Sequence, residues 1–217
     1  NSLAKIDDIN KLIEPLFNDK VFELNKNKFN FQNTLDELIF NKFEGQIDTG
    51  EMMDALLNKA YKSNIRIINN VSVESYEDIG PSVKVNTNQF TISCNKLFIA
   101  TNGFSESIIQ EKVVPARAQV LITKPIKNLK VIGTFHFQQG YYYFRNIDDR
   151  ILLGGGRNLD FHIENTNQFG VTDTIQSKLE QLLTDVILPQ SNFEIEQRWS
   201  GIMGIGNKKT TITKQLS

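Results

Sequence analysis

Side chains able to bind a small ion alternate in residues 141–145, which read Tyr-Tyr-Tyr-Phe-Arg. Because neighbouring residues of a strand point to opposite faces, Tyr141, Tyr143 and Arg145 share one face of the expected strand. Tyrosine hydroxyls and a guanidinium can hold a carboxylate or amine against an apolar wall. A half-exposed sheet face without a ligand fits the pattern equally well. Arg157 and Arg198 are further candidate anion contacts, with a structural role as the alternative for each.

A second candidate is the turn Thr101-Asn102-Gly103, which follows an apolar strand expected at residues 96–100. A helix at 43–63 and a mostly apolar strand at 65–73 precede it, an order that suggests a parallel sheet covered on both faces. Ligands of such sheets lie beyond the carboxyl ends of the strands. A glycine there lets a phosphate or ribose approach the backbone. The alternative is a plain turn.

Other chemistries find little support. Gly154-Gly155-Gly156 has no helix pattern after it, so we interpret it as a bend at a strand end rather than a phosphate loop. His136 and His162 are too few for a metal site, and none is predicted. No serine lies in a G-x-S-x-G motif, and the catalytic residues stay unknown.

Composition narrows the class of protein. The chain has 217 residues, a formal net charge of −1 and scattered lysines, which argues against binding to nucleic acid. No apolar run approaches the roughly 20 residues needed to span a bilayer. The N-terminus lacks the pattern of a secretory signal. A single cysteine, Cys94, excludes an intrachain disulfide, so we expect a cytoplasmic location.

Periodicity predicts the remaining elements. A helix at 7–17 begins the chain, and the helix at 43–63 is expected to bury one face made of Met52, Met53, Leu56, Leu57, Ala60 and Tyr61. Short strands with polar turns predict an antiparallel meander from 119 to 154, followed by a long helix over 172–188. The last elements expected are a strand at 193–199, a glycine-rich loop at 200–206 and a short strand at 210–213.

The predicted fold class is therefore α+β (mixed α/β). It combines a partial sheet with a helix and an antiparallel sheet covered by a long helix. Residues 1–110 form the first domain with a helical N-terminal segment, and residues 111–206 form the second. Residues 207–217 would turn back toward the first domain.

Five stretches within about residues 43–206 form an ordered series: EGQIDTGEMMDALLNKAYKSNIRIINNVSVESYED, KLFIATNGFS, VPARAQVLIT, YYYFRNIDDRILLGGGR and FEIEQRWSGIMG. This series resembles the D-amino-acid-oxidase-like (glycine oxidase-like) family of FAD-dependent oxidoreductases. No single stretch is decisive, but their order is specific.

The resemblance implies that the first sheet with its helix is part of an FAD-binding domain and that the antiparallel sheet belongs to a substrate domain. It also implies contacts with the cofactor. Val73 would meet the adenosine part of FAD, and residues 100–103 (Ala100, Thr101, Asn102 and Gly103) would lie beside its pyrophosphate. Arg117 and Gln119 lie in a segment like the family's P-x-R-G-Q entry to the substrate domain, with Ala118 in place of the usual glycine.

The resemblance also implies the substrate pocket. The sheet from 119 to 156 would wall it, and the loop at 200–204, with Gly204, would pack by the flavin. The expected substrate contacts are Tyr143, Arg145, Arg157 and Met203. Members that use amino acids often carry an arginine at about position 203. This chain has Met203 there, which argues against a simple amino-acid substrate.

Two family segments, the N-terminal G-x-G-x-x-G unit and the C-terminal glycine-rich unit, have no counterpart in the sequence. We expect an interior fragment that binds FAD weakly or not at all by itself. The expected parent oxidises a C–N bond of a small amine or amino acid by hydride transfer to flavin. The alternative is a non-catalytic binding or scaffold module that has lost the cofactor site. The oligomeric state is left open.

Overall fold

The computed structural model describes residues 3–109, 113–207 and 210–215. The chain forms two compact units, each made of three stretches. Unit 1 comprises Asn1–Asp48, Gln119–Leu159 and Val171–Trp199, and unit 2 comprises Thr49–Ala118, Asp160–Gly170 and Ser200–Ser217. The predicted domain boundaries at residues 110 and 206 stay a prediction.

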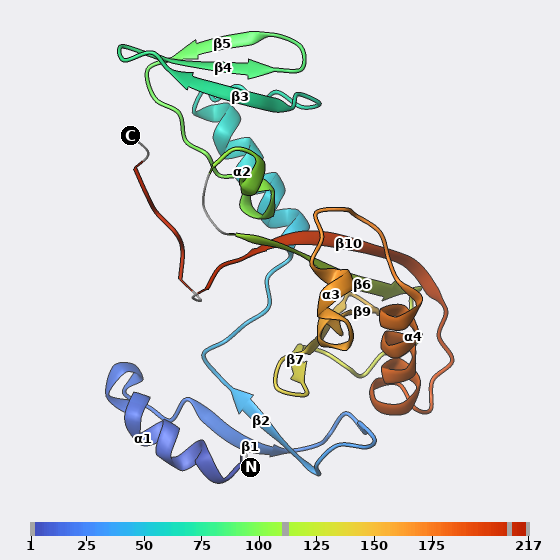
Figure 1. The fold of residues 1–217 in the computed structure, drawn as a ribbon. Coiled ribbons are helices and arrows are strands. Elements are labelled where there is room, and N and C mark those ends of the chain that lie inside the picture. The colour runs from blue at the N-terminus through green and yellow to red at the C-terminus, as the bar shows by residue number, and fades with distance from the viewer. Residues whose placement is uncertain (1–2, 110–112, 208–209, 216–217) are drawn as a thin grey trace. The chain divides into compact units, whose positions relative to one another are not determined.

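Unit 1 is built on the meander that the sequence predicts. Its five-stranded sheet has the order β10-β6-β9-β8-β7, and the pairs β6/β9, β8/β9 and β7/β8 are antiparallel. The strands, labelled in part in Figure 1, are β6 (Val114–Thr123), β7 (Thr134–Phe137), β8 (Tyr142–Ile147), β9 (Arg150–Gly155) and β10 (Ile195–Ile205). By the unit boundaries, β6 and β10 each contain residues of both units.

One face of this sheet is covered by the long helix. The helix is α4 (Asp173–Leu182), continued by a π-helical turn η4 (Leu183–Ile187), and Figure 1 shows α4 beside β9. Ile175, Leu179 and Leu183 from the helix are at most 1% exposed and pack with buried residues of β6, β8 and β9. The predicted helix over 172–188 and the fold class are confirmed.

The N-terminal segment adds a helix and a hairpin to unit 1. Its elements are η1 (Leu3–Lys5), α1 (Ile6–Phe17), β1 (Phe22–Lys26) and β2 (Glu37–Asn41). Asn10 is buried in α1 and holds the hairpin, because its side chain donates to the Phe22 carbonyl and accepts from the Val21 and Phe22 amides. Phe31 from the hairpin loop stacks edge-on against Phe144 of β8 and so joins the core.

Unit 2 contains one long helix and a second antiparallel meander. Its elements are α2 (Thr49–Lys62), β3 (Val73–Asp78), β4 (Val83–Thr87), β5 (Thr91–Cys94), η2 (Asn102–Ser107) and α3 (Phe161–Glu164). The sheet order is β3-β4-β5, and both pairs are antiparallel. Unlike α4, α2 has no buried residue: Met53 is 49% and Leu56 52% exposed, so the expected burial of its apolar face is wrong.

Several expected strands are not formed in the part of the chain that the structure describes. Residues 65–72, 96–100 and 210–213 lie outside any strand, and the expected parallel pairing is absent there. A strand is held by hydrogen bonds to a neighbouring strand, and these segments have no such neighbour in any of the three sheets. Conversely, the expected loop at 200–206 is mostly strand, because β10 continues to Ile205 beside β6.

Candidate functional site

The face of the unit 1 sheet opposite the buried core carries the tyrosine and arginine that the sequence singles out. Tyr143 and Arg145 point to the face opposite Tyr142 and Phe144, which are buried in the core. Across the strand pairs, Tyr143 faces Gly154 and Arg145 faces Leu152. Tyr141 precedes β8 and is 47% exposed. The predicted sharing of a face therefore holds for the two residues that lie in β8.

The ring of Tyr143 lies over the backbone of β9. A Cβ added to Gly154 would lie 2.6 Å from the Tyr143 hydroxyl oxygen and 2.6 Å from a methyl group of Val120. Burial raises the pKa of Tyr143, so the hydroxyl stays protonated and can donate a hydrogen bond at neutral pH. The glycine at position 154 is thus required by the tyrosine.

Arg145 is half-buried and anchored by one backbone contact. Its Nη1 donates to the carbonyl oxygen of Ile47, also in unit 1. On the next strand, Thr134 faces Arg145 and His136 faces Tyr143. A guanidinium has five N–H donors, so this single contact leaves Arg145 able to bind an anion.

The glycine triplet ends β9 as a bend. Gly155 and Gly156 have φ angles of 121° and 79°, and a Cβ on Gly155 would lie 2.1 Å from the Tyr141 carbonyl oxygen. The bend is confirmed, but the expected absence of helix after it is wrong. A 3-10 turn, η3 (Arg157–Leu159), contains the half-buried Arg157, and α3 follows because Asp160 caps the amide of Ile163.

Gln119 serves a buried hydrogen-bond network within unit 1. Its Oε1 accepts from the Thr172 amide and from Gln176, and its Nε2 donates to the Thr172 hydroxyl. Arg198 continues this network from β10 to α4, donating to Gln176 at 2.8 Å and to Glu180 at 2.7 Å. This placement gives Arg198 the structural role that the sequence left as its alternative.

In unit 2 the structure brings together four of the predicted residues. The side chain of Asn102 accepts a 2.7 Å hydrogen bond from the amide of Gly204. A Cβ on Gly103 would lie 2.8 Å from the Met203 carbonyl oxygen, and one on Gly204 would lie 2.7 Å from Asn102 Oδ1. The backbones of η2 and β10 therefore meet here, and the meeting itself requires both glycines.

Two hydroxyls beside this meeting point can hold a polar ligand. Thr101 Oγ1 and Ser105 Oγ are buried, and neither has a hydrogen-bond partner among the residues that the structure describes. A buried hydroxyl without a partner is costly, so these atoms fit a bound group with hydrogen-bonding oxygens, as the phosphates and ribose of FAD have. Ala100 precedes them outside any strand, and Val73 begins β3 at 43% exposure.

Arg117 is held by a residue that the sequence did not single out. Its Nε and Nη2 each donate a 2.9 Å hydrogen bond to the carboxylate of Glu164, which is 1% exposed. The hydrogen bonds that Arg117 donates to Glu164 raise the pKa of Arg117 further above its ordinary value. No local pattern signals a pair 47 positions apart.

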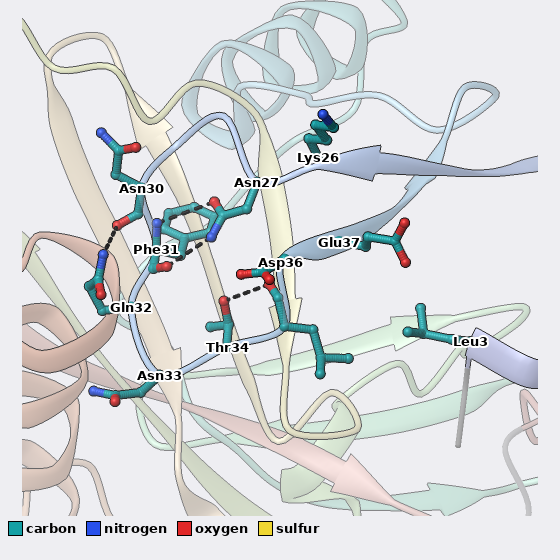
Figure 2. A pocket seen from close by; sticks show the side chains of 11 residues that line it. Leu3, Lys26, Asn27, Asn30, Phe31, Gln32, Asn33, Thr34, Asp36 and Glu37 are labelled. Carbon is teal, nitrogen blue, oxygen red and sulfur yellow. Dashed lines mark hydrogen bonds between the residues drawn. The ribbon is translucent and has the colours of Figure 1, made fainter.

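A separate open pocket of about 740 Å³ lies at the N-terminal hairpin. Figure 2 shows it lined by Leu3 and the loop from Lys26 to Glu37, with Asn27 bonded twice to the backbone of Phe31. None of the candidate residues lines it, and most of its side chains are exposed.

The residues described contain no group of three or more histidines, cysteines and carboxylates that could hold a metal ion. None of the described helices combines the length and apolar character of a membrane span.

Comparison with known proteins defines the family. Residues 20–214 match the family described as FAD dependent oxidoreductase (DAO), so the chain belongs to this family. No curated protein gives a significant match.

Solved structures share the fold at low sequence identity. L-proline dehydrogenase from P. horikoshii has a TM-score of 0.78 and 19% identity over 99% of the chain. Glycine oxidase from Geobacillus kaustophilus has a TM-score of 0.73 and 13% identity over 93% of the chain. L-amino acid deaminase from Proteus vulgaris has a TM-score of 0.69 and 12% identity over 94% of the chain. The chain spans 61%, 56% and 62% of these three structures, respectively.

Proposed function

We propose that the chain forms the larger part of an FAD-dependent oxidoreductase that oxidises a C–N bond of a small amine or amino acid. The observation that carries this proposal is that Tyr143 and Arg145 lie on the same face of the sheet, in a chain that belongs to the FAD dependent oxidoreductase family. FAD, when bound, would supply the hydride acceptor for this oxidation.

The residues proposed to hold FAD lie mostly in unit 2. The free hydroxyls of Thr101 and Ser105 support this assignment, because they can bond to phosphate or ribose oxygens. The resemblance adds Val73, Ala100, Asn102, Gly103, Arg117, Gln119 and Gly204. Among these, the Gln119 amide already bonds within unit 1, so we assign it the weakest claim to a cofactor contact.

The proposed substrate contacts are Tyr143, Arg145, Arg157 and Met203. The Tyr143 hydroxyl and the Arg145 guanidinium would orient a carboxylate or other polar end of the substrate. Val120 and Leu152 lie opposite Gly154 and Arg145 in the strand register and give this face an apolar component. An apolar wall excludes water and strengthens the polar contacts beside it.

The test uses the full open reading frame that contains these residues. We expect bound flavin that absorbs at roughly 450 nm and bleaches anaerobically with a subset of primary and secondary amines or amino acids. The Tyr143→Phe, Arg145→Met double variant should retain flavin but bind the active substrate about tenfold or more weakly, since hydrogen bonds to charged groups are lost. Tyr141→Phe, which alters an exposed neighbour, is the matched control.

Two results would contradict the proposal. Unchanged substrate affinity in the double variant would remove Tyr143 and Arg145 from the site. Absence of flavin from the full-length protein would favour the alternative of a binding or scaffold module. For the 217-residue chain alone we predict weak or no FAD binding, and a stoichiometric flavin spectrum of the purified chain would contradict that prediction.

A further inference from the structure

Arg117 uses only one edge of its guanidinium within the protein. The Nε and Nη2 edge is occupied by both oxygens of Glu164. The guanidinium has five N–H donors, so the Nη1 group and the second hydrogen of Nη2 remain. These atoms have no acceptor in the described part of the chain. A planar guanidinium with one edge fixed presents the other in a defined direction.

A glycine, Gly170, lies beside Nη1 of Arg117. Gly170 has a φ angle of 137°, and a Cβ built on it would find only Arg117 Nη1 within 4 Å, at 3.8 Å. The Gly170 amide donates to the hydroxyl of Ser200, which fixes the position of this glycine. Next to it, Phe169 lies 6.2 Å from Phe104 between ring centroids, and both rings are exposed. An exposed aromatic ring therefore lies next to Gly170 in the chain, and a flat group can pack against such a ring.

The net charge of the Arg117–Glu164 pair limits which chemical groups can bind the free edge of Arg117. The carboxylate of Glu164 compensates the positive charge of Arg117, so the pair is neutral as a whole. A multiply charged phosphate would gain little from a neutral pair, whereas two oxygens in one plane match the two parallel N–H bonds of the free edge. Both a carboxylate and the two-carbonyl edge of a flavin ring have this shape.

We propose that Glu164 is a positioning residue that holds Arg117 so that its outer edge binds a flat pair of oxygen acceptors, a carboxylate or the two-carbonyl edge of flavin. This inference deepens the proposed function and rests on it for the two sources of the acceptor. It assigns a role to a buried carboxylate, which the sequence pattern leaves unnoticed, and places the contact in unit 2.

The experiment follows Arg117 directly in the 217-residue chain labelled with ¹⁵N-arginine. The Nε–H signal of Arg117 is identified by its loss in Arg117→Lys. Sodium benzoate supplies the carboxylate, and riboflavin supplies the flavin ring without phosphate. We expect at least one probe to shift this signal saturably. In Glu164→Gln the affinity should fall about tenfold, because the amide accepts one hydrogen bond where the carboxylate accepts two.

Arg150→Lys is the matched control, since it alters another arginine that pairs with a glutamate, Glu196, and should leave the affinity unchanged. A response to benzoate alone assigns the edge to a substrate carboxylate, and a response to riboflavin alone assigns it to the cofactor. No saturable shift with either probe in the parental chain overturns the proposal, even if Glu164→Gln fails to fold. Equal affinity in a folded Glu164→Gln overturns the positioning role. The assay needs no turnover, so its failure is separate from a failure of the oxidoreductase proposal.

Discussion

The backbone of Gly103 lies directly against the carbonyl of Met203, so that a Cβ on the glycine would be 2.8 Å from that oxygen. The neighbouring bond from the Gly204 amide to Asn102 holds the same two segments together. Glycine at 103 is therefore a packing requirement of unit 2, whatever ligand also lies near it. The expected place of Gly103 beside the FAD pyrophosphate stays a prediction.

Gly103→Ala should destabilise unit 2 by about 1–3 kcal/mol, because the new methyl group meets backbone atoms that cannot move independently. Urea unfolding followed by circular dichroism measures the change. Gly201→Ala is the control, since a Cβ there has no atom within 4 Å, and it should shift stability by less than about 0.5 kcal/mol. Equal effects of the two substitutions would contradict the packing argument.

The Arg117 and Glu164 pair gives a second prediction. Glu164→Ala should cost about 3–5 kcal/mol, because it leaves a buried guanidinium without its counter-charge. The Arg117→Met, Glu164→Leu double variant should lose much less than the sum of the single substitutions, since neither charge then remains buried. Denaturant unfolding of the four members of the cycle provides the coupling energy. Additive losses would show that the two side chains do not act as a pair.

The sequence predicts unit 1 better than unit 2, for a physical reason. Residues 119–188 show alternating strands and a helical stripe, and each pattern finds its partner within unit 1, as Leu179 does against the sheet. Segments 65–72 and 96–100 have equally apolar patterns but no neighbouring strand. A pattern indicates which face is suited to burial, but burial needs a second surface, which local sequence does not specify.

The candidate site, like the fold, was predictable from the sequence only where a local pattern determines it. Strand alternation places Tyr143 and Arg145 on one face, and this is what the structure shows. The contact of Asn102 with Gly204 joins positions 102 residues apart, and Glu164 lies 47 residues from Arg117. Such pairs depend on tertiary structure and leave no periodic signal in a single sequence.

The uncovered face of α2 leads to a third prediction. Leu56 is 52% exposed, whereas Leu179 in α4 is fully buried. Leu56→Gln should therefore change the free energy of unfolding by less than about 0.5 kcal/mol. Leu179→Ala should cost about 2–5 kcal/mol through lost burial and the cavity it leaves. Chemical denaturation of both variants measures these changes. A decrease of more than about 2 kcal/mol in the free energy of unfolding for Leu56→Gln would mean that another surface covers α2 in solution.

The last prediction concerns alkaline pH. Burial raises the pKa of Tyr143 in the folded chain above the ordinary value near 10. Between the unfolded and folded values the unfolded chain binds fewer protons, so the free energy of unfolding falls as pH rises. This contribution is fully present below about pH 10 and is lost as pH rises through the folded pKa. Tyr143→Phe should remove it and flatten the fall in stability between about pH 9.5 and 11.

Urea midpoints measured across that range test this expectation. Tyr141→Phe is the control, because it removes a more exposed hydroxyl two positions away in the same chain. An unchanged slope in Tyr143→Phe would mean that water reaches the Tyr143 hydroxyl freely in the folded chain. The same phenol would then be a poor partner for a substrate anion, because an exposed hydrogen bond competes with water. The alkaline slope therefore tests, without any flavin present, whether the face that carries Tyr143 and Arg145 is dry enough to recognise a small polar ligand.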